Sequence, residues 1–173
     1  MAEVSIYKLH NLQDVEVCDA LFRAYMRWLI EELQSVHGIL ILPEQEERLH
    51  LAFREEWPAM VEGDGGIYLA LVGGVPSGVC TLKPINDKEV ELKRFYVSPG
   101  CRGNGVGKQL MELALNEAKQ FGYETVRLET FAFMKSAVKM YKAYGFKEVA
   151  PFDGFEGSDQ GTGGVELFMR LEF

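Results

Sequence analysis

Four glycines and two basic side chains lie between Tyr96 and Leu115, where a β-like run meets a helix-like one. Glycine lets the backbone approach a ligand closely, and the N–H groups at a helix start attract anions. Two common phosphate loops are excluded by the spacing. A Walker A loop needs glycine at the position of Arg102 and a hydroxyl at that of Gln109. The dinucleotide fingerprint GxGxxG needs glycine at the position of Lys108.

The pattern that remains is RxxGxG, formed by Arg102, Gly105 and Gly107. An anion could lie against backbone that lacks Cβ atoms, and Arg102 and Lys108 add positive charge. A diphosphate therefore fits this loop better than a single carboxylate. On this motif alone, a tight strand-to-helix turn that needs glycine only for its φ angles is an equal alternative.

The elements that must hold this loop follow from hydrophobic periodicity. A strand is expected over 4–9, and a helix over 14–34 that ends before Gly38. A second helix begins near Pro43, and Pro58 kinks or shortens it. A hairpin turns at Gly73 and Gly74. The later expected elements are a strand over 89–97, a helix over 104–121, a strand over 125–130, a helix over 136–144, a further short strand over 147–150 and a strand over 165–171. This β-α-α-β-β-β-α-β-α-β order predicts an α/β (α+β) fold with a mixed sheet flanked by helices.

Composition narrows the class of protein. With 173 residues, 47% of them hydrophobic, the chain suits a single domain over residues 1–173. A net charge of −8 disfavours nucleic-acid binding. The start has no signal-peptide pattern and no apolar run reaches about 18 residues, so we expect a cytoplasmic protein without membrane contact. Three cysteines without CxxC spacing and three scattered histidines predict no metal site.

Two segments resemble the GNAT superfamily of N-acetyltransferases. "ELKRFYVSPGCRGNGVGKQL" is similar to its motif A, and "AVKMYKAYGFKEV" is similar to its motif B, usually AxxxYxxxGF. Ala137, Tyr141, Gly145 and Phe146 match motif B, and the resemblance runs from about residue 66 to 173. It implies acetyl-CoA as cosubstrate and the topology expected above.

The resemblance also implies which residues contact acetyl-CoA. Backbone groups of Phe95, Tyr96 and Val97 would pair with the pantetheine arm like one more strand. The pyrophosphate would be held by Arg102, Gly103, Asn104, Gly105, Val106, Gly107 and Lys108. Many members carry asparagine three positions before the motif B alanine, where it commonly helps hold the cofactor, whereas this chain has Met134.

Tyr141 matches the family position that protonates the departing CoA thiolate, and a phenol can donate to sulfur in this way. The alternative is that Tyr141 is core, on one helical stripe with Ala137, Met140 and Tyr144. Glu91 matches a glutamate that takes the amine proton in several members. Period-2 alternation places it on the face of Lys93, Phe95 and Val97. The alternative is a solvent-facing Glu91 paired with Lys93 or Arg94. Glu129 is a second candidate for the base or for a substrate anchor.

The expected reaction is direct attack of an amine on the thioester, with the amine entering between the strands that end near Val97 and Thr130. An acyl-cysteine at Cys101 ranks below it, because no base is placed beside that thiol. The acceptor is a small-molecule amine or a peptide amine. The rival class is a CoA-binding regulatory module without catalysis. Specificity is expected from "QSVHGILILPEQ" and from residues 151–164. The apolar "GILIL" would line the pocket or form a homodimer face.

Overall fold

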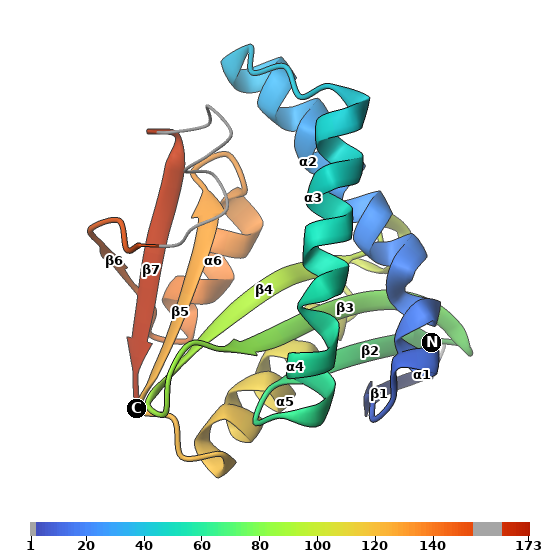
Figure 1. Cartoon of the computed structure of the whole chain (residues 1–173), viewed down its shortest axis with the longest axis vertical. Coiled ribbons are helices and arrows are strands. Elements are labelled where there is room, and N and C mark those ends of the chain that lie inside the picture. Colours follow the sequence, from blue (N-terminus) through green and yellow to red (C-terminus); the bar gives the residue numbers. More distant parts are fainter. Residues whose placement is uncertain (1–2, 154–163) are drawn as a thin grey trace.

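The computed structural model describes residues 3–153 and 164–173, and one seven-stranded sheet runs through them in the order β1-β2-β3-β4-β5-β7-β6 (Figure 1). The strands are β1 Val4–Lys8, β2 Gly66–Val72, β3 Val75–Pro84, β4 Glu89–Val97, β5 Thr125–Phe131, β6 Lys147–Val149 and β7 Glu166–Glu172. Only β4 and β5 run parallel, while the other neighbouring pairs are antiparallel. The predicted mixed sheet and element order are confirmed.

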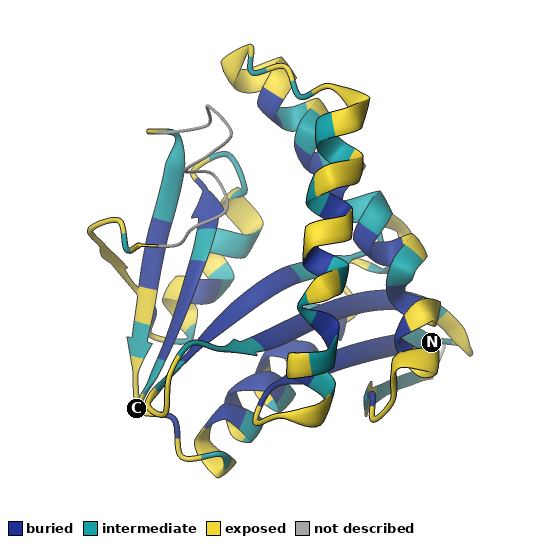
Figure 2. Ribbon diagram, in the orientation of Figure 1, coloured by how far each residue is buried: buried dark blue, intermediate teal, exposed yellow. Residues whose placement is uncertain are grey.

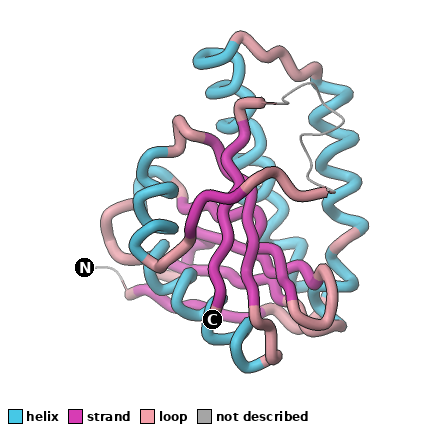
Figure 3. Tube along the Cα trace, turned by 90° about the vertical axis from the view of Figure 1, so that its left-hand side faces the viewer, coloured by secondary structure: helices cyan, strands magenta, loops and turns pink. Residues whose placement is uncertain are grey.

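Helices cover both faces of the sheet (Figure 3). One layer contains α1 Leu12–Val15, the 3₁₀ turn η1 Glu16–Cys18, α2 Asp19–His37, α3 Pro43–Glu55 and α4 Trp57–Glu62. The other contains α5 Val106–Gln120, which follows the 3₁₀ turn η2 Pro99–Cys101, and α6 Lys135–Ala143. Alternate residues of β2 serve the two cores: Ile67 and Leu69 pack under α2 and α4, and Tyr68 and Ala70 pack under α5. This is the period-2 pattern of a strand buried on both faces.

Local signals explain where the elements end. The predicted helix over 14–34 is divided into α1, η1 and α2, and α2 ends at Gly38, whose φ of 68° is left-handed. The second helix is interrupted where predicted, because α3 ends at Glu55 and α4 begins at Trp57 with Pro58 in its first turn. Gly73 and Gly74 have φ of 58° and 81°, as a tight hairpin turn requires.

The sheet opens between β4 and β5 (Figure 1). β4 pairs with β5 only over residues 89–91, opposite residues 125–127. β5 then stays with β7 along residues 125–131. Beyond Glu91, the edge of β4 that faces β5 is therefore not paired with it. Most of β4 is nonetheless buried, as Figure 2 shows for the middle of the sheet.

A β-bulge in β4 corrects one prediction. Val79 pairs with Tyr96 and Thr81 with Lys93, so two residues of β4 oppose one of β3, and Arg94 has a left-handed φ of 51°. The extra residue reverses the alternation. Phe95 and Val97 pack toward α5, whereas the Lys93 ammonium reaches Glu56, at the junction of α3 and α4. Glu91 therefore does not share a face with Phe95 and Val97, since strict alternation cannot detect a bulge.

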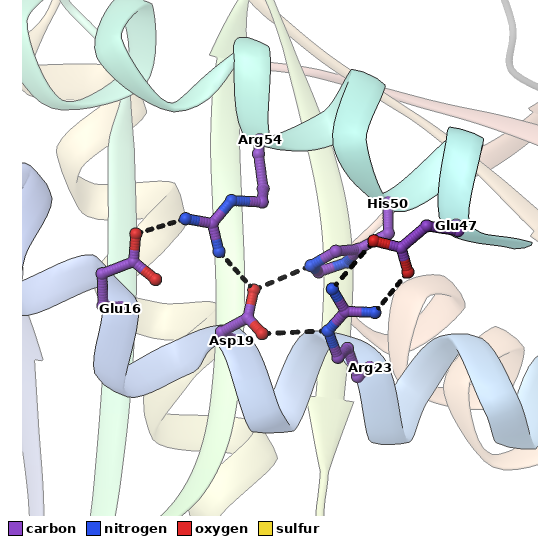
Figure 4. A network of polar contacts seen from close by, with 6 residues as sticks. All are labelled: Glu16, Asp19, Arg23, Glu47, His50 and Arg54. Carbon is purple, nitrogen blue, oxygen red and sulfur yellow. Dashed lines mark hydrogen bonds and ion pairs between the residues drawn. The ribbon is translucent and has the colours of Figure 1, made fainter.

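A charged network fastens α3 to α2 (Figure 4). The Asp19 carboxylate accepts from Arg23 at 3.0 Å and Arg54 at 2.8 Å, and lies 2.7 Å from the buried His50 ring. Arg23 also binds Glu47, and Arg54 binds Glu16. Burial opposes ionisation of Asp19, but the hydrogen bonds from His50, Arg23 and Arg54 outweigh it and lower the pKa of the carboxyl. These contacts fix the angle between two helices that wall the site.

Candidate active site

A groove with a volume of about 540 Å³ lies beside the end of β4. Five parts of the chain meet there: α2, the end of β4, the loop into α5 with the first turn of that helix, the connection from β5 to α6, and α6 itself. The described lining residues are Tyr25, Trp28, Phe95, Tyr96, Val97, Arg102, Gly103, Gly105, Gly107, Lys108, Phe133, Met134, Lys135, Ser136, Ala137 and Met140. One wall of the groove is thus the edge of β4 that is not paired with β5, and one end of the groove is the start of α5.

The glycine loop at that end has the geometry of an anion cradle. Gly103 and Gly105 have φ of 81° and 79°, and Gly105 is the N-cap of α5. First-turn N–H groups of a helix have no intrahelical acceptor and carry the positive end of its dipole. A Cβ on Gly107 would meet Phe95, Val97 and Met140 only at ordinary contact distance, 3.7–3.8 Å. Packing alone therefore does not require glycine at position 107, which lines the groove.

The two basic side chains of the loop are held differently. Arg102 donates from Nε to the carbonyl of Val97 at 2.9 Å. Its guanidinium carbon lies 5.7 Å from the Trp28 ring and 5.9 Å from the Tyr96 ring. This arginine thus ties the end of β4 to the loop. Lys108 is 71% exposed and lies 3.7 Å from Glu112, so its ammonium is accessible to an anion in the groove.

Eight of the ten residues predicted to contact the cofactor line this groove. The other two are Asn104, which is exposed, and Val106, whose side chain is 1% exposed in the core under α5. Val106 therefore offers only its backbone. Sequence reasoning missed the opposite wall, formed by Tyr25 and Trp28 of α2 and by Phe133. The i, i+3 spacing of Tyr25 and Trp28 was the available signal, but helical spacing alone does not separate core from pocket.

Tyr141 lies one layer behind the groove. Its side chain is 5% exposed and is not among the lining residues. Its ring packs edge-on against Phe95, which does line the groove, at 6.3 Å between centroids, and lies tilted against Phe146 at 5.8 Å. Burial raises the pKa of the Tyr141 phenol above its usual value, so the hydroxyl stays protonated at working pH and has a proton to donate. The catalytic role stays a prediction.

A second, smaller cavity of about 70 Å³ lies under α2 and α3. Its described lining consists of Tyr25, Met26, Leu29, Ile30, Leu33, Ile41, Leu49, Glu91, Leu92, Lys93, Arg94, Glu129 and Phe131. Tyr25 lines this cavity and the groove, so the two spaces adjoin at its side chain. Ile41 of the apolar "GILIL" segment lines the cavity, while Leu40 is 63% exposed. Of residues 151–164, the other segment expected to set specificity, 154–163 lie outside the described residues.

Both carboxylates predicted as base candidates line the small cavity, but Glu91 is not solvent-facing. It is 4% exposed and accepts from the Arg127 guanidinium at 3.0 Å and 3.2 Å, and Glu89 lies 3.6 Å from the same guanidinium. The alternative of a solvent-facing Glu91 paired with Lys93 or Arg94 is thus not what the structure has, since Glu91 pairs with Arg127 of β5, the parallel neighbour. Glu91 can reach Arg127 because the two residues lie opposite each other, at the last paired position of β4 and β5 before the sheet opens.

Comparison with known proteins now decides the family. The model of the Acetyltransferase (GNAT) family matches residues 22–146. The chain belongs to this GNAT family. An uncharacterized N-acetyltransferase, YjgM, of Escherichia coli (strain K12) is 33% identical over 100 residues, 58% of this chain and 53% of that protein. An IAA acetyltransferase of Azospirillum brasilense is 32% identical over 80 residues, 46% of this chain and 49% of that protein. The chain thus spans about half the length of these relatives.

Solved GNAT structures share the fold over nearly the whole chain. A paia N-acetyltransferase from Thermoplasma acidophilum, in complex with coenzyme A, has a TM-score of 0.73 and 20% identity, covering 99% of both chains. A GNAT acetyltransferase from Staphylococcus aureus has a TM-score of 0.70 and 16% identity, covering 98% of this chain and 99% of the other. At such identities the agreement concerns the fold.

Within 3–153 and 164–173, no group of three or more His, Cys, Asp and Glu side chains could hold a metal ion. Within those ranges, no helix is long and apolar enough to cross a bilayer. Cys101 is half-buried in η2 and is not among the residues lining either cavity, so the acyl-cysteine route gains no geometric support.

Proposed function

We propose that this GNAT protein transfers the acetyl group of acetyl-CoA to a primary amine by direct attack. One observation carries the proposal: the unpaired edge of β4 and the glycine cradle at the start of α5 line the same groove. An extended pantetheine arm can pair with such an edge, and a pyrophosphate suits such a helix start. The similar fold of a protein solved with coenzyme A supports this assignment of the groove.

In this mechanism the adjoining cavity holds the acceptor and the groove holds the thioester, with Tyr25 at the boundary. The amine nitrogen bonds to the acetyl carbon, and the carbon–sulfur bond breaks. The amine proton leaves to Glu91, Glu129 or water, and the thiolate takes a proton, for which Tyr141 is our candidate donor. Holding both reactants side by side supplies much of the rate. The products are the N-acetyl amine and free CoA.

The rival function is that of a regulatory module that binds CoA and has lost catalysis. Within the proposed function, the alternative acceptor is a peptide amine. Free CoA release from acetyl-CoA, measured with a mixed panel of amines, tests the proposal. We expect release above the rate of hydrolysis with at least one amine. Binding of acetyl-CoA without release by any amine, including a lysine-containing peptide, would support the regulatory module instead.

Three broader expectations belong to this proposal. We take residues 1–173 as one domain, since β1 and β7, from opposite ends of the chain, share one sheet. A cytoplasmic location stays a prediction, as does a homodimer through "GILIL". In support of a contact surface there, Val36, Leu40 and Leu42 at the tip of α2 and α3 are at least 42% exposed.

A further inference from the structure

The groove and the small cavity follow each other along the same parts of the chain. On β4, residues 91–94 line the cavity and residues 95–97 line the groove. At the end of β5, Phe131 lines the cavity, and Phe133 in the following connection lines the groove. Among the described lining residues, Tyr25 alone belongs to both spaces. A chemical group that extends from the groove into the cavity therefore passes beside Tyr25.

We propose that Tyr25 determines the choice of acyl donor, because its ring keeps acyl chains longer than acetyl out of the cavity. In the proposed function an amine in the cavity attacks a thioester in the groove, so the acetyl group lies where the two spaces meet. A longer chain on the same thioester would meet the ring there. The inference rests on the proposed function and names the residue that keeps the acyl group and the acceptor apart.

The ring of Tyr25 is held in place on the groove side. Its centroid lies 5.9 Å from that of Tyr96 and 6.3 Å from that of Trp28, and both of these residues line the groove. The Arg102 guanidinium carbon in turn lies 5.7 Å from the Trp28 ring and 5.9 Å from the Tyr96 ring. A movement of the Tyr25 ring out of the boundary would lose its aromatic contacts, so the packing opposes that movement.

On its other side, the Tyr25 side chain packs against apolar residues of the cavity. The buried members of that core cluster, all of which line the cavity, are Met26, Leu29, Leu33 and Phe131. Tyr25 also packs against the core cluster that contains Tyr96. The side chain thus lies between two cores, at the point where the two spaces meet. Beyond it are apolar walls, against which the methylene groups of an acyl chain would be buried if the side chain were smaller.

The consequence for the reaction is a division of space between the two reactants. An acyl chain that entered the cavity would occupy the place of the amine, and the amine could not then reach the thioester. An acetyl group that stops at Tyr25 leaves the cavity to the acceptor. This role belongs to the ring of Tyr25 and does not depend on its hydroxyl group.

The experiment measures the dissociation constants of acetyl-CoA, butyryl-CoA and hexanoyl-CoA by calorimetry, without an amine, for wild type and Tyr25→Ala. Binding of the donor alone is measured because it does not require the acceptor to be known. Wild type should bind the two longer donors no more tightly than acetyl-CoA. Each methylene group that becomes buried strengthens binding about 4-fold, so Tyr25→Ala should bind butyryl-CoA on the order of 10-fold more tightly than acetyl-CoA.

Matched variants separate the ring of Tyr25 from other effects. Tyr25→Phe keeps the ring and removes the hydroxyl, so the ratio of the dissociation constants should stay that of wild type. Met140→Ala enlarges the groove at α6, away from the cavity, and should also leave the ratio unchanged. Tyr25→Leu is a smaller truncation that should shift the ratio in the same direction, and it provides a second measurement if Tyr25→Ala does not fold.

Failure of the inference can be told from failure of the proposed function. Wild type that binds hexanoyl-CoA several-fold more tightly than acetyl-CoA would overturn the inference, because the ring would then not restrict the chain. A wild-type ratio in both Tyr25→Ala and Tyr25→Leu would also overturn it, as would an equal change in Met140→Ala. Acetyl-CoA still binds in each of these cases, so the proposed function stands. If wild type binds none of the three donors, the proposed function itself fails.

Discussion

The phenol of Tyr141 occupies an unusual place for a proton donor, because its ring is buried behind Phe95 rather than in the groove lining. If it protonates the leaving thiolate, Tyr141→Phe should lower kcat by about 100-fold or more and change the dissociation constant of acetyl-CoA little. Steady-state kinetics and calorimetry measure the two effects. Tyr144→Phe is the matched control, since Tyr144 is the C-cap residue of the same helix and is not among the residues that line the groove. Unchanged turnover in Tyr141→Phe would mean that Tyr141 only packs in the core and is not the proton donor.

Glu91 has two candidate roles that an experiment must separate: base in the reaction, and partner of Arg127 in a buried ion pair. Removing one partner of a buried pair leaves a charge uncompensated, so Glu91→Gln should cost about 3 kcal/mol of unfolding free energy. Denaturant unfolding measures this cost. The exposed pair of Lys88 and Glu124 is the control, and Glu124→Gln should cost less than about 1 kcal/mol. A Glu91→Gln protein of unchanged stability with low kcat would instead favour the role of base.

At the scale of elements, the network around Asp19 sets how α3 lies on α2, and both helices wall the small cavity (Figure 4). Asp19→Asn removes the charge that Arg23, Arg54 and His50 share. It should therefore destabilise the protein at pH 7 by about 2 kcal/mol, as lost charge-assisted hydrogen bonds do. Asp87→Asn, in the exposed turn between β3 and β4, is the control.

The sign of the pH dependence follows from the lowered pKa of Asp19. Its stabilisation is fully present above the unfolded value, about 3.9, and is lost as pH falls through the lower folded value. The difference in unfolding free energy between wild type and Asp19→Asn should therefore shrink below about pH 4. A difference that stays constant down to pH 2 would contradict this role.

At the scale of the whole molecule, the groove joins the two parts of the sheet that separate beyond Glu91. CoA bound there would touch β4, α5 and α6 together and should stabilise the fold. At 100 times its dissociation constant the gain is about 2.7 kcal/mol, or about 5–10 °C in Tm for a chain of this length. Thermal unfolding measures it. ATP has phosphates but no pantetheine arm and should shift Tm less, and an equal shift would contradict the groove assignment.

Much of the fold was predictable because its signals are local. Glycines at Gly38, Gly73 and Gly74 mark real left-handed positions, and the period of the apolar residues separates strands from helices. The RxxGxG loop likewise falls where predicted, since its residues are neighbours along the chain. The sequence by itself thus determined the order of the elements, the glycine-rich loop at the start of α5 and the family motifs.

Only the tertiary structure decided which side chains lie on the same face of the sheet, which of them pair, and which line the cavities. The bulge at Arg94 reverses the faces of β4, and it depends on pairing with β3 that no local pattern encodes. The pairing of Glu91 with Arg127 requires β4 and β5 to be neighbours in one register, 36 residues apart in sequence. Tyr25 reaches both cavities only because α2 crosses the open end of the sheet. These features depend on contacts between distant residues, and such contacts form only when the chain folds.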